Sequence, residues 1–347
     1  MAPSGTTQAV TFKRPQVRQA TGCPLTGLPH PVAVSTVEHC SSRNPTTEPF
    51  PNPEAQMRNI DIVVGTDGSE PSRSAVRWAA AEARLHAAPL KILTAYSWKG
   101  PPEAVGGTGE LPNVIAQQFD QVAAGAAAEA RTLEPGIEVS GAAVLGDPAS
   151  VLLDAGRTAA MLVAGSRGRG GFASLLLGSV SQHLATHAAG PVVVVRGRAD
   201  TTSGPIVVGV DGSASAQRAL ALAFEEAQRR GSGLLAVRSY SVPMPVYEMD
   251  ISPLPYDPDA AWRDAARDLN ATLTPWRDKY PTVSVQTLTE PGSAAKNLVD
   301  VSGDAALLIV GSRGHGALVG SLLGSVGQQL LHHAGCPVMI VHPERAT

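Results

Sequence analysis

The chain has 347 residues, more than one typical domain core holds, so its length predicts about two domains. Its composition of 43% hydrophobic and 16% charged residues is that of a globular protein, and its net charge of −3 argues against the broad basic surface of a nucleic-acid-binding protein. No apolar run approaches the roughly 18 residues of a membrane span, the first residues lack the apolar core of a secretory signal, and the three cysteines form no CxxC pair. We therefore expect a cytoplasmic protein that contacts neither membrane nor nucleic acid.

Residues 1–56 are rich in Pro, Ser and Thr and show neither a strand period nor a helix period, which predicts a disordered tail. Its cysteines and histidines (Cys23, His30, His39 and Cys40) match no familiar zinc spacing, so we expect no metal site there.

An internal repeat fills the remainder of the chain. The segment 63–83, which begins VVGTDGS, returns at 207–227 as VVGVDGS, an offset of 144 residues. The segment 161–195 returns at 307–341 with an offset of 146 residues, so the second copy carries two extra residues between these blocks. A repeat this long is a whole domain, which predicts domains at 57–200 and 201–347.

Short apolar runs alternate with helical patterns in each copy. In the first copy we expect strands at 60–64, 90–96, 139–145, 159–165 and 191–195, and helices at 72–86, 115–133, 149–157 and 179–188. Such alternation, with strands that are apolar throughout, predicts an α/β fold: two tandem domains, each with a doubly wound, five-stranded parallel sheet. The linker between the copies is short, so we expect them to pack together.

Two glycine-rich loops follow strands at equivalent places. Residues 165–179 read GSRGRGGFASLLLGS and residues 311–325 read GSRGHGALVGSLLGS, so both copies have the spacing G-x2-G-x9-G-S. Ser179 with Gln182, and Ser325 with Gln328, fit a capping box at a helix start. The free N–H groups of a helix N-terminus suit a phosphate, which the arginine of each loop (Arg167 or Arg313) would also attract. The alternative is that each loop is only a flexible turn. The same glycine spacing in both copies favours a ligand site.

An aspartate ends the first strand of each copy, Asp67 in one and Asp211 in the other. Its carboxylate can accept a hydrogen bond from an adenine amino group or a ribose hydroxyl. It can equally stabilise the turn into the next helix. The two roles are compatible, and the sequence leaves both open.

These residues together resemble the universal stress protein family in its tandem two-domain form, over about residues 57–343. The spacing G-x2-G-x9-G-[ST] is the ATP-binding signature of that family. The resemblance implies a fold of the adenine nucleotide alpha hydrolase-like type, ATP in each half either alone or with Mg²⁺, and a pseudo-twofold pairing of the last strands. One departure is visible, because the turn Gly146-Asp147-Pro148 of the first copy is replaced by Gly292-Ser293-Ala294 in the second.

The resemblance also implies which residues contact ATP, from the adenine end to the phosphates. In the first copy they are Gly65, Asp67, Ala95, Gly165, Ser166, Arg167, Gly168, Gly178, Ser179 and Val180. In the second copy they are Gly209, Asp211, Val237, Gly311, Ser312, Arg313, Gly314, Gly324, Ser325 and Val326.

Three classes of function follow from this pattern. The first is an ATP-binding, nucleotide-responsive regulator in the stress response, which we favour, acting as a homo-oligomer (a dimer of tandem chains). The second is a nucleotide-hydrolysing or nucleotidyl-transferring enzyme of related architecture. The sequence has no HxGH or KMSKS motif and no catalytic pair common to both copies. We therefore expect at most weak ATP hydrolysis and assign no catalytic residue. The third is a stress protein with empty pockets, against which the complete loop in both copies weighs.

Overall fold

The computed structural model describes residues 61–97, 110–168, 176–199, 203–241, 258–314 and 323–343, and the expected tail at 1–56 lies outside them. The strands of the first half are β1 (Ile62–Gly65), β2 (Leu90–Tyr96), β3 (Val139–Leu145), β4 (Met161–Gly165) and β5 (Val192–Val195). Its helices are α1 (Glu70–His86), α3 (Glu110–Leu133), α4 (Pro148–Ala155) and α5 (Ser179–His187).

The second half repeats this order of elements. Its strands are β6 (Ile206–Gly209), β7 (Leu234–Tyr240), β8 (Val285–Pro291), β9 (Leu307–Gly311) and β10 (Val338–Val341). Its helices are α6 (Ala214–Arg230), α7 (Pro258–Lys279), α8 (Ala294–Ser302) and α9 (Ser325–His333). In the described residues, no helix combines the length and the apolar character needed to cross a membrane.

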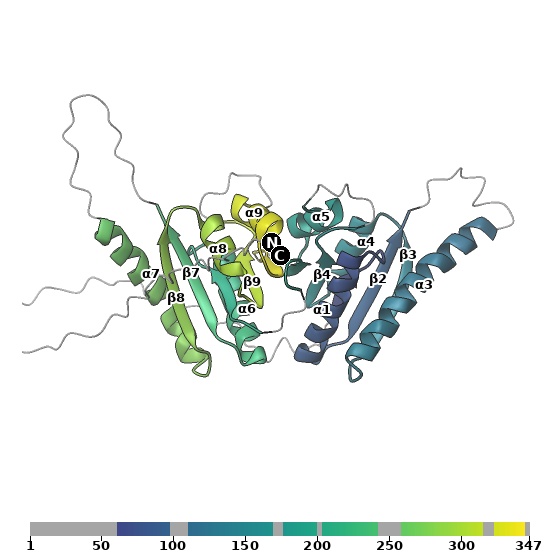
Figure 1. The fold of residues 1–347 in the computed structure, drawn as a ribbon, viewed down its shortest axis with the longest axis horizontal. Helices are drawn as coiled ribbons and strands as arrows, with labels where there is room; N and C mark the ends of the chain where they lie inside the picture. Colours follow the sequence, from purple (N-terminus) through teal and green to yellow (C-terminus); the bar gives the residue numbers. More distant parts are fainter. Residues whose placement is uncertain are drawn as a thin grey trace, which may run out of the picture. The chain divides into compact units, whose positions relative to one another are not determined.

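The strands of both halves form one sheet in the order β3-β2-β1-β4-β5-β10-β9-β6-β7-β8 (Figure 1). Every neighbouring pair is parallel except β5 and β10, which run antiparallel with Val194 opposite Val338 and Val192 opposite Ile340. The prediction of two doubly wound, five-stranded parallel sheets related by a pseudo-twofold is therefore confirmed. Pairing of β5 with β10 covers one of the two edges of each half, and β3 and β8 form the edges of the combined sheet.

Side chains of each strand alternate between two apolar layers. In β1, Ile62 and Val64 pack with helices α1 and α3, whereas Val63 packs on the opposite face with Leu152 of α4 and Leu184 of α5. The second half is built in the same way, with α6 and α7 on the first face and α8 and α9 on the other. Coverage of both faces explains why the strands are apolar throughout.

Four ionisable side chains meet where α1 of the first half packs against α6 of the second. Glu82 and His86 come from α1, and Glu226 and Arg230 occupy the equivalent positions of α6. The Arg230 guanidinium bonds to Glu82, and its Nε lies 3.4 Å from Glu226 Oε2. On the other side, His86 Nε2 lies 2.9 Å from Glu226 Oε1 and 3.6 Å from Glu82 Oε2. We call these four residues the interface network; both of its carboxylates are only 1% exposed.

Candidate functional site

Each half contains one cavity at the carboxyl ends of its central strands. The cavity of the first half has a volume of about 360 Å³ and that of the second about 310 Å³. They are lined mostly by equivalent positions of the repeat, so a cavity occurs at the same place in each half. In doubly wound sheets this is the place where ligands bind.

The predicted site residues come together around these cavities. In the first half all of them line the cavity except Ser166, and in the second half all of them do. Ser166 instead positions the loop, because its carbonyl accepts a hydrogen bond of 2.8 Å from the Gly178 amide; the Ser312 carbonyl does the same for Gly324 at 2.7 Å. The role of the lining residues toward a ligand stays a prediction, and residues 169–175 and 315–322 of the loops lie outside the described residues.

The predicted capping boxes are wrong. The N-cap residues of α5 and α9 are Gly178 and Gly324, each with extended backbone, and neither helix has a side-chain cap. Ser179 and Ser325 are therefore the first helical residues rather than caps. The consequence bears on function: glycine offers no side-chain acceptor, so the first-turn N–H groups that face the cavity are left for something else to bind.

The glycine-rich loop approaches the aspartate closely in both halves. A side chain at Gly168 would place its Cβ 2.5 Å from Asp67 Oδ2, and one at Gly314 would place it 2.4 Å from Asp211 Oδ2. Only glycine lets the loop backbone lie against that carboxylate. The loop and the end of the first strand thus form one continuous wall, although they are far apart in the sequence.

The aspartates also stabilise the turns that follow them. Asp67 Oδ1 accepts hydrogen bonds from the Ser69 amide at 3.0 Å and from its hydroxyl at 2.6 Å. Asp211 Oδ1 accepts one from the Ser213 amide at 2.9 Å. The turn-forming role considered for these residues is therefore confirmed, and Oδ2 of each carboxylate lies beside the loop glycine.

The altered turn of the second copy still caps its helix. In the first half Asp147 accepts a hydrogen bond of 3.0 Å from the Ser150 amide, and bonds from Ser150 hold the pKa of Asp147 below its usual value. In the second half Ser293 accepts one of 3.5 Å from the Lys296 amide. Replacement of the Asp-Pro pair by Ser-Ala therefore changes the capping group and keeps the helix start.

Sequence reasoning missed three residues of the apolar walls, namely Leu93, Leu152 and Leu298. Leu93 and Leu152 line the first cavity, and the predicted Val237 lies with Leu298 at the equivalent places in the second. The predicted residues Ala95 and Val237 do not occupy equivalent positions: Leu93 pairs with Gly65 as Val237 pairs with Gly209, so Val237 corresponds to Leu93, and Ala95 to Ser239. The repeat offset of 144 residues predicts this correspondence, because it aligns position 93 with 237 and position 95 with 239.

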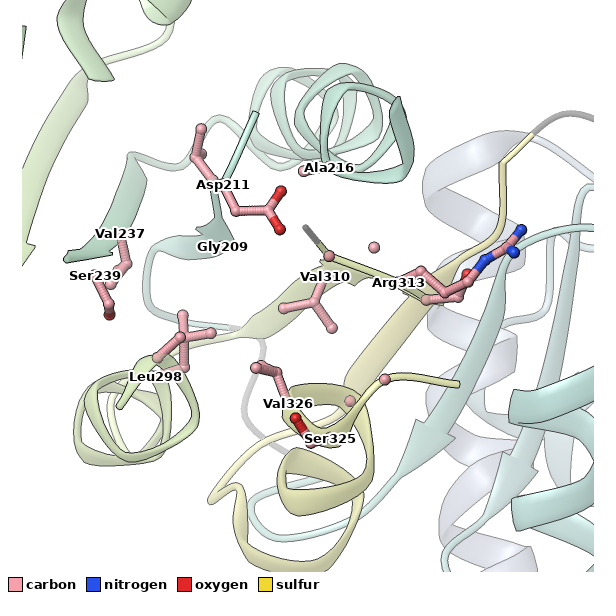
Figure 2. Close-up of a pocket in the computed structure, with 17 residues that line it drawn as sticks. Gly209, Asp211, Ala216, Val237, Ser239, Leu298, Val310, Arg313, Ser325 and Val326 are labelled. Atoms are coloured by element: carbon pink, nitrogen blue, oxygen red, sulfur yellow. The ribbon is translucent and has the colours of Figure 1, made fainter. Parts of the chain in front are cut away.

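The cavity of the second half shows how these groups are divided (Figure 2). Val237, Ser239 and Leu298 gather at one side of the hollow, and Arg313 lies at the opposite side. Asp211 reaches in from the end of β6, and Ser325 and Val326 mark the start of α9. An apolar end and an end at which helix α9 begins therefore share one cavity, an arrangement that suits a ligand with a flat apolar group and an anionic group.

The fold and its paired cavities define a tandem α/β protein with two potential ligand sites. Comparison with known proteins gives the family: the model of the universal stress protein family matches residues 60–196 and 203–342. A universal stress protein of Mycolicibacterium smegmatis is 35% identical over 297 residues, covering 81% of this chain and 97% of that relative. Another, from Mycobacterium tuberculosis strain H37Rv, is 35% identical over 290 residues, covering 80% of this chain and 96% of that relative. The chain belongs to the universal stress protein family.

Solved structures agree on the fold. The crystal structure of a universal stress protein from Archaeoglobus fulgidus matches with a TM-score of 0.62 and 20% sequence identity, covering 82% of this chain and 98% of that one. A putative universal stress protein from Pseudomonas aeruginosa matches with a TM-score of 0.54 and 14% identity, covering 82% of this chain and 93% of that one. Both likenesses extend over the two halves, so the tandem arrangement itself is shared.

Proposed function

We propose that each half binds ATP, alone or with Mg²⁺, and that the protein is a nucleotide-responsive regulator in the stress response. The observation that carries this proposal is the glycine-capped helix start in each cavity. Its first-turn amides have no side-chain acceptor, and Ser179 and Val180, like Ser325 and Val326, line the cavity. The positive end of the helix dipole and the nearby arginine favour a phosphate chain at that end.

The opposite end of each cavity suits a nucleoside. Leu93 and Leu152, or Val237 and Leu298, offer apolar surface to a base. The carboxylate of Asp67 or Asp211, which lines the cavity, is of a kind that accepts a hydrogen bond from a ribose hydroxyl or an adenine amino group. Cavity volumes near the lower end of the range of about 300–1,000 Å³ for small-molecule sites fit one nucleotide per half.

The lining favours binding over catalysis. In the part of the cavities that the structure describes, the ionisable side chains are one aspartate and one arginine per half: Asp67 with Arg167, and Asp211 with Arg313. Each aspartate is already engaged in its turn, so the described lining contains no general base held in reserve. This supports a regulator with at most slow ATP hydrolysis rather than an enzyme.

The proposal includes a cytoplasmic location and a dimer of tandem chains. Because β5 and β10 already pair within one chain, that pair of edges is closed. A dimer of tandem chains would have to use another surface.

The test changes Gly178 and Gly324 to valine together. Gly178 has an ordinary φ of −80°, and a Cβ there would lie 3.4 Å from its nearest neighbour, so the fold should tolerate the change while the side chain occupies the space beside the amides. Loss of one or two charge-assisted hydrogen bonds should weaken ATP binding about tenfold to several thousandfold in titration calorimetry. Gly136→Val is the matched control, because a Cβ at Gly136 meets no atom within 4 Å.

Two results would count against this function. One is a folded double variant that binds ATP as tightly as the unchanged chain. The other is freshly purified protein that releases no nucleotide into acid, by mass analysis, and shows no heat of binding with ATP, ADP or GTP; that result would support the empty-pocket alternative.

A further inference from the structure

Among the positions at which the two cavities differ, one changes a methyl group to a hydroxyl at the apolar end. The first cavity has Ala95 there, and the second has Ser239. Ser239 lies beside Val237 and near Leu298, away from Arg313 (Figure 2). The second half therefore places a hydroxyl where the first half has a methyl group.

A neighbouring amide fixes this hydroxyl. Asn297 Nδ2 donates to Ser239 Oγ at 3.0 Å and to the Pro291 carbonyl at 3.3 Å. With Oγ acting as acceptor toward Asn297, the hydroxyl proton is left to donate elsewhere. No described residue of the protein accepts it. The equivalent of Asn297 in the first half is Val151, so both members of this pair are absent there.

Other hydroxyls that line only the first cavity do not compensate. Ser72 Oγ donates to the Ser69 carbonyl at 2.9 Å, and Thr66 Oγ1 lies 3.0 Å from Ser72 Oγ, so these two groups use their protons on the protein. Ser181 Oγ donates to the Gly165 carbonyl at 2.5 Å. Among the described lining residues, a hydroxyl donor of this kind at the apolar end is found in the second cavity and not in the first.

We propose that Ser239, oriented by Asn297, donates a hydrogen bond to a ring nitrogen of the purine base in the second site, and that this site binds ATP more tightly than the first. The proposal rests on the proposed ATP-binding function. Purine ring nitrogens are acceptors, and the half-buried Ser239 hydroxyl, whose proton no described residue accepts, is complementary to one of them. Two different affinities in one chain widen the range of ATP concentration over which its occupancy changes.

The experiment examines each site alone. Gly178→Val leaves the second site intact and Gly324→Val leaves the first, and ATP is titrated into both by calorimetry. Ser239→Ala on the Gly178→Val background should weaken binding about two- to tenfold, as expected for one neutral hydrogen bond. Ala95→Ser with Val151→Asn on the Gly324→Val background should strengthen the first site by a similar factor.

Deaza analogues distinguish a direct contact from a general effect on the fold. ATP analogues in which the N1, N3 or N7 nitrogen is replaced by carbon are titrated into the Gly178→Val chain with and without Ser239→Ala. One analogue should bind both chains equally, because it lacks the acceptor that Ser239 uses. Asn297→Leu should reproduce part of the loss, because the hydroxyl is then free to turn away.

The experiment distinguishes failure of the proposed role of Ser239 from failure of the proposed ATP binding. If Ser239→Ala leaves ATP affinity unchanged, or if every analogue distinguishes the two chains as ATP does, the role of Ser239 is refuted while ATP binding stands. If neither single-site chain nor the unchanged chain binds ATP, the proposed function fails and this inference fails with it.

Discussion

The interface network predicts that protein stability depends on pH through Glu82. Burial raises the pKa of Glu82 to about 7, against the attraction of Arg230. Burial also opposes ionisation of Glu226, but its hydrogen bond to His86 and the charges of His86, Arg230 and Arg229 hold its pKa below the usual value. The neighbours differ: His86 Nε2 lies 2.9 Å from Glu226 Oε1, and Arg229 and Arg230 also lie near Glu226, whereas the negative charge of Glu226 adds to the rise in the pKa of Glu82.

The directions of these pKa shifts determine how the free energy of unfolding changes with pH. Between the usual pKa of 4.5 and about 7, folded Glu82 keeps a proton that the unfolded chain releases, so the free energy of unfolding falls as the pH rises through this range. At about 1.4 kcal/mol per pH unit, the loss amounts to at most about 3 kcal/mol. Glu226 acts in the opposite sense and lowers stability only as the pH falls through its depressed pKa.

The assay compares urea unfolding of the unchanged chain and Glu82→Gln between pH 4.5 and 8. Glutamine keeps an acceptor for Arg230 and cannot ionise, so the stability of Glu82→Gln relative to the unchanged chain should rise by up to about 3 kcal/mol between pH 4.5 and 7 and then level off. Glu225→Gln is the control, because Glu225 lies on the same helix, is partly exposed and pairs with Arg229 at the surface.

Two results would refute this reasoning. The first is a pair of parallel stability curves for Glu82→Gln and the unchanged chain across this pH range. The second concerns metal, because ligand atoms of Glu82, His86 and Glu226 lie within 4.8 Å of one another. We expect zinc to leave the melting temperature unchanged, since Arg230 already neutralises part of the charge of the two carboxylates. A rise in melting temperature that a chelator reverses and that His86→Ala abolishes would identify a metal site instead.

The remaining predictions concern the tail, the strand pairing and the aspartates. A chain of residues 57–347 should melt at the same temperature as the full chain, and a loss of several degrees in calorimetry would show that the tail packs on the core. The separated half 57–200 should self-associate in sedimentation experiments, because its β5 edge lacks β10; a half that stays monomeric at high concentration would contradict this. Asp67→Ala with Asp211→Ala should weaken ATP binding and reduce the preference for ATP over GTP in calorimetry, whereas an unchanged ratio would confine both residues to their turns.

Much of the fold could be predicted because the strands are short apolar runs that are easy to recognise in the sequence. The expected strands at 90–96 and 139–145 coincide with β2 and β3, since each is an apolar run between turn residues. Helix α1 begins at Glu70 rather than at residue 72, because Pro71 fits the first turn of a helix and does not end it. The cavities followed from glycine spacing, which marks where backbone must approach closely.

Features that depend on packing between the halves could not be predicted from local patterns. Glu82 and Arg230 have the charges of solvent-exposed helix positions, and only the contact of α1 with α6 buries them. The cap at Gly178 was missed because a serine stood next to it with a suitably spaced glutamine. The inequivalence of Ala95 and Val237 was open to sequence reasoning, since a strict use of the repeat offset aligns Ala95 with Ser239.

The tandem arrangement explains why such differences between the halves can exist at all. Two identical chains that paired their last strands around a twofold axis would carry the same residue at both equivalent positions. In a single chain those positions are independent, so the interface network combines His86 with Arg230. Two arginines would neutralise Glu82 and Glu226 at every physiological pH, and two histidines would leave both charges dependent on pH. With one of each, Arg230 contacts both carboxylates and His86 lies closer to Glu226, while burial raises the pKa of Glu82 alone. In the same way, Ser239 gives one cavity a hydroxyl that its repeat lacks.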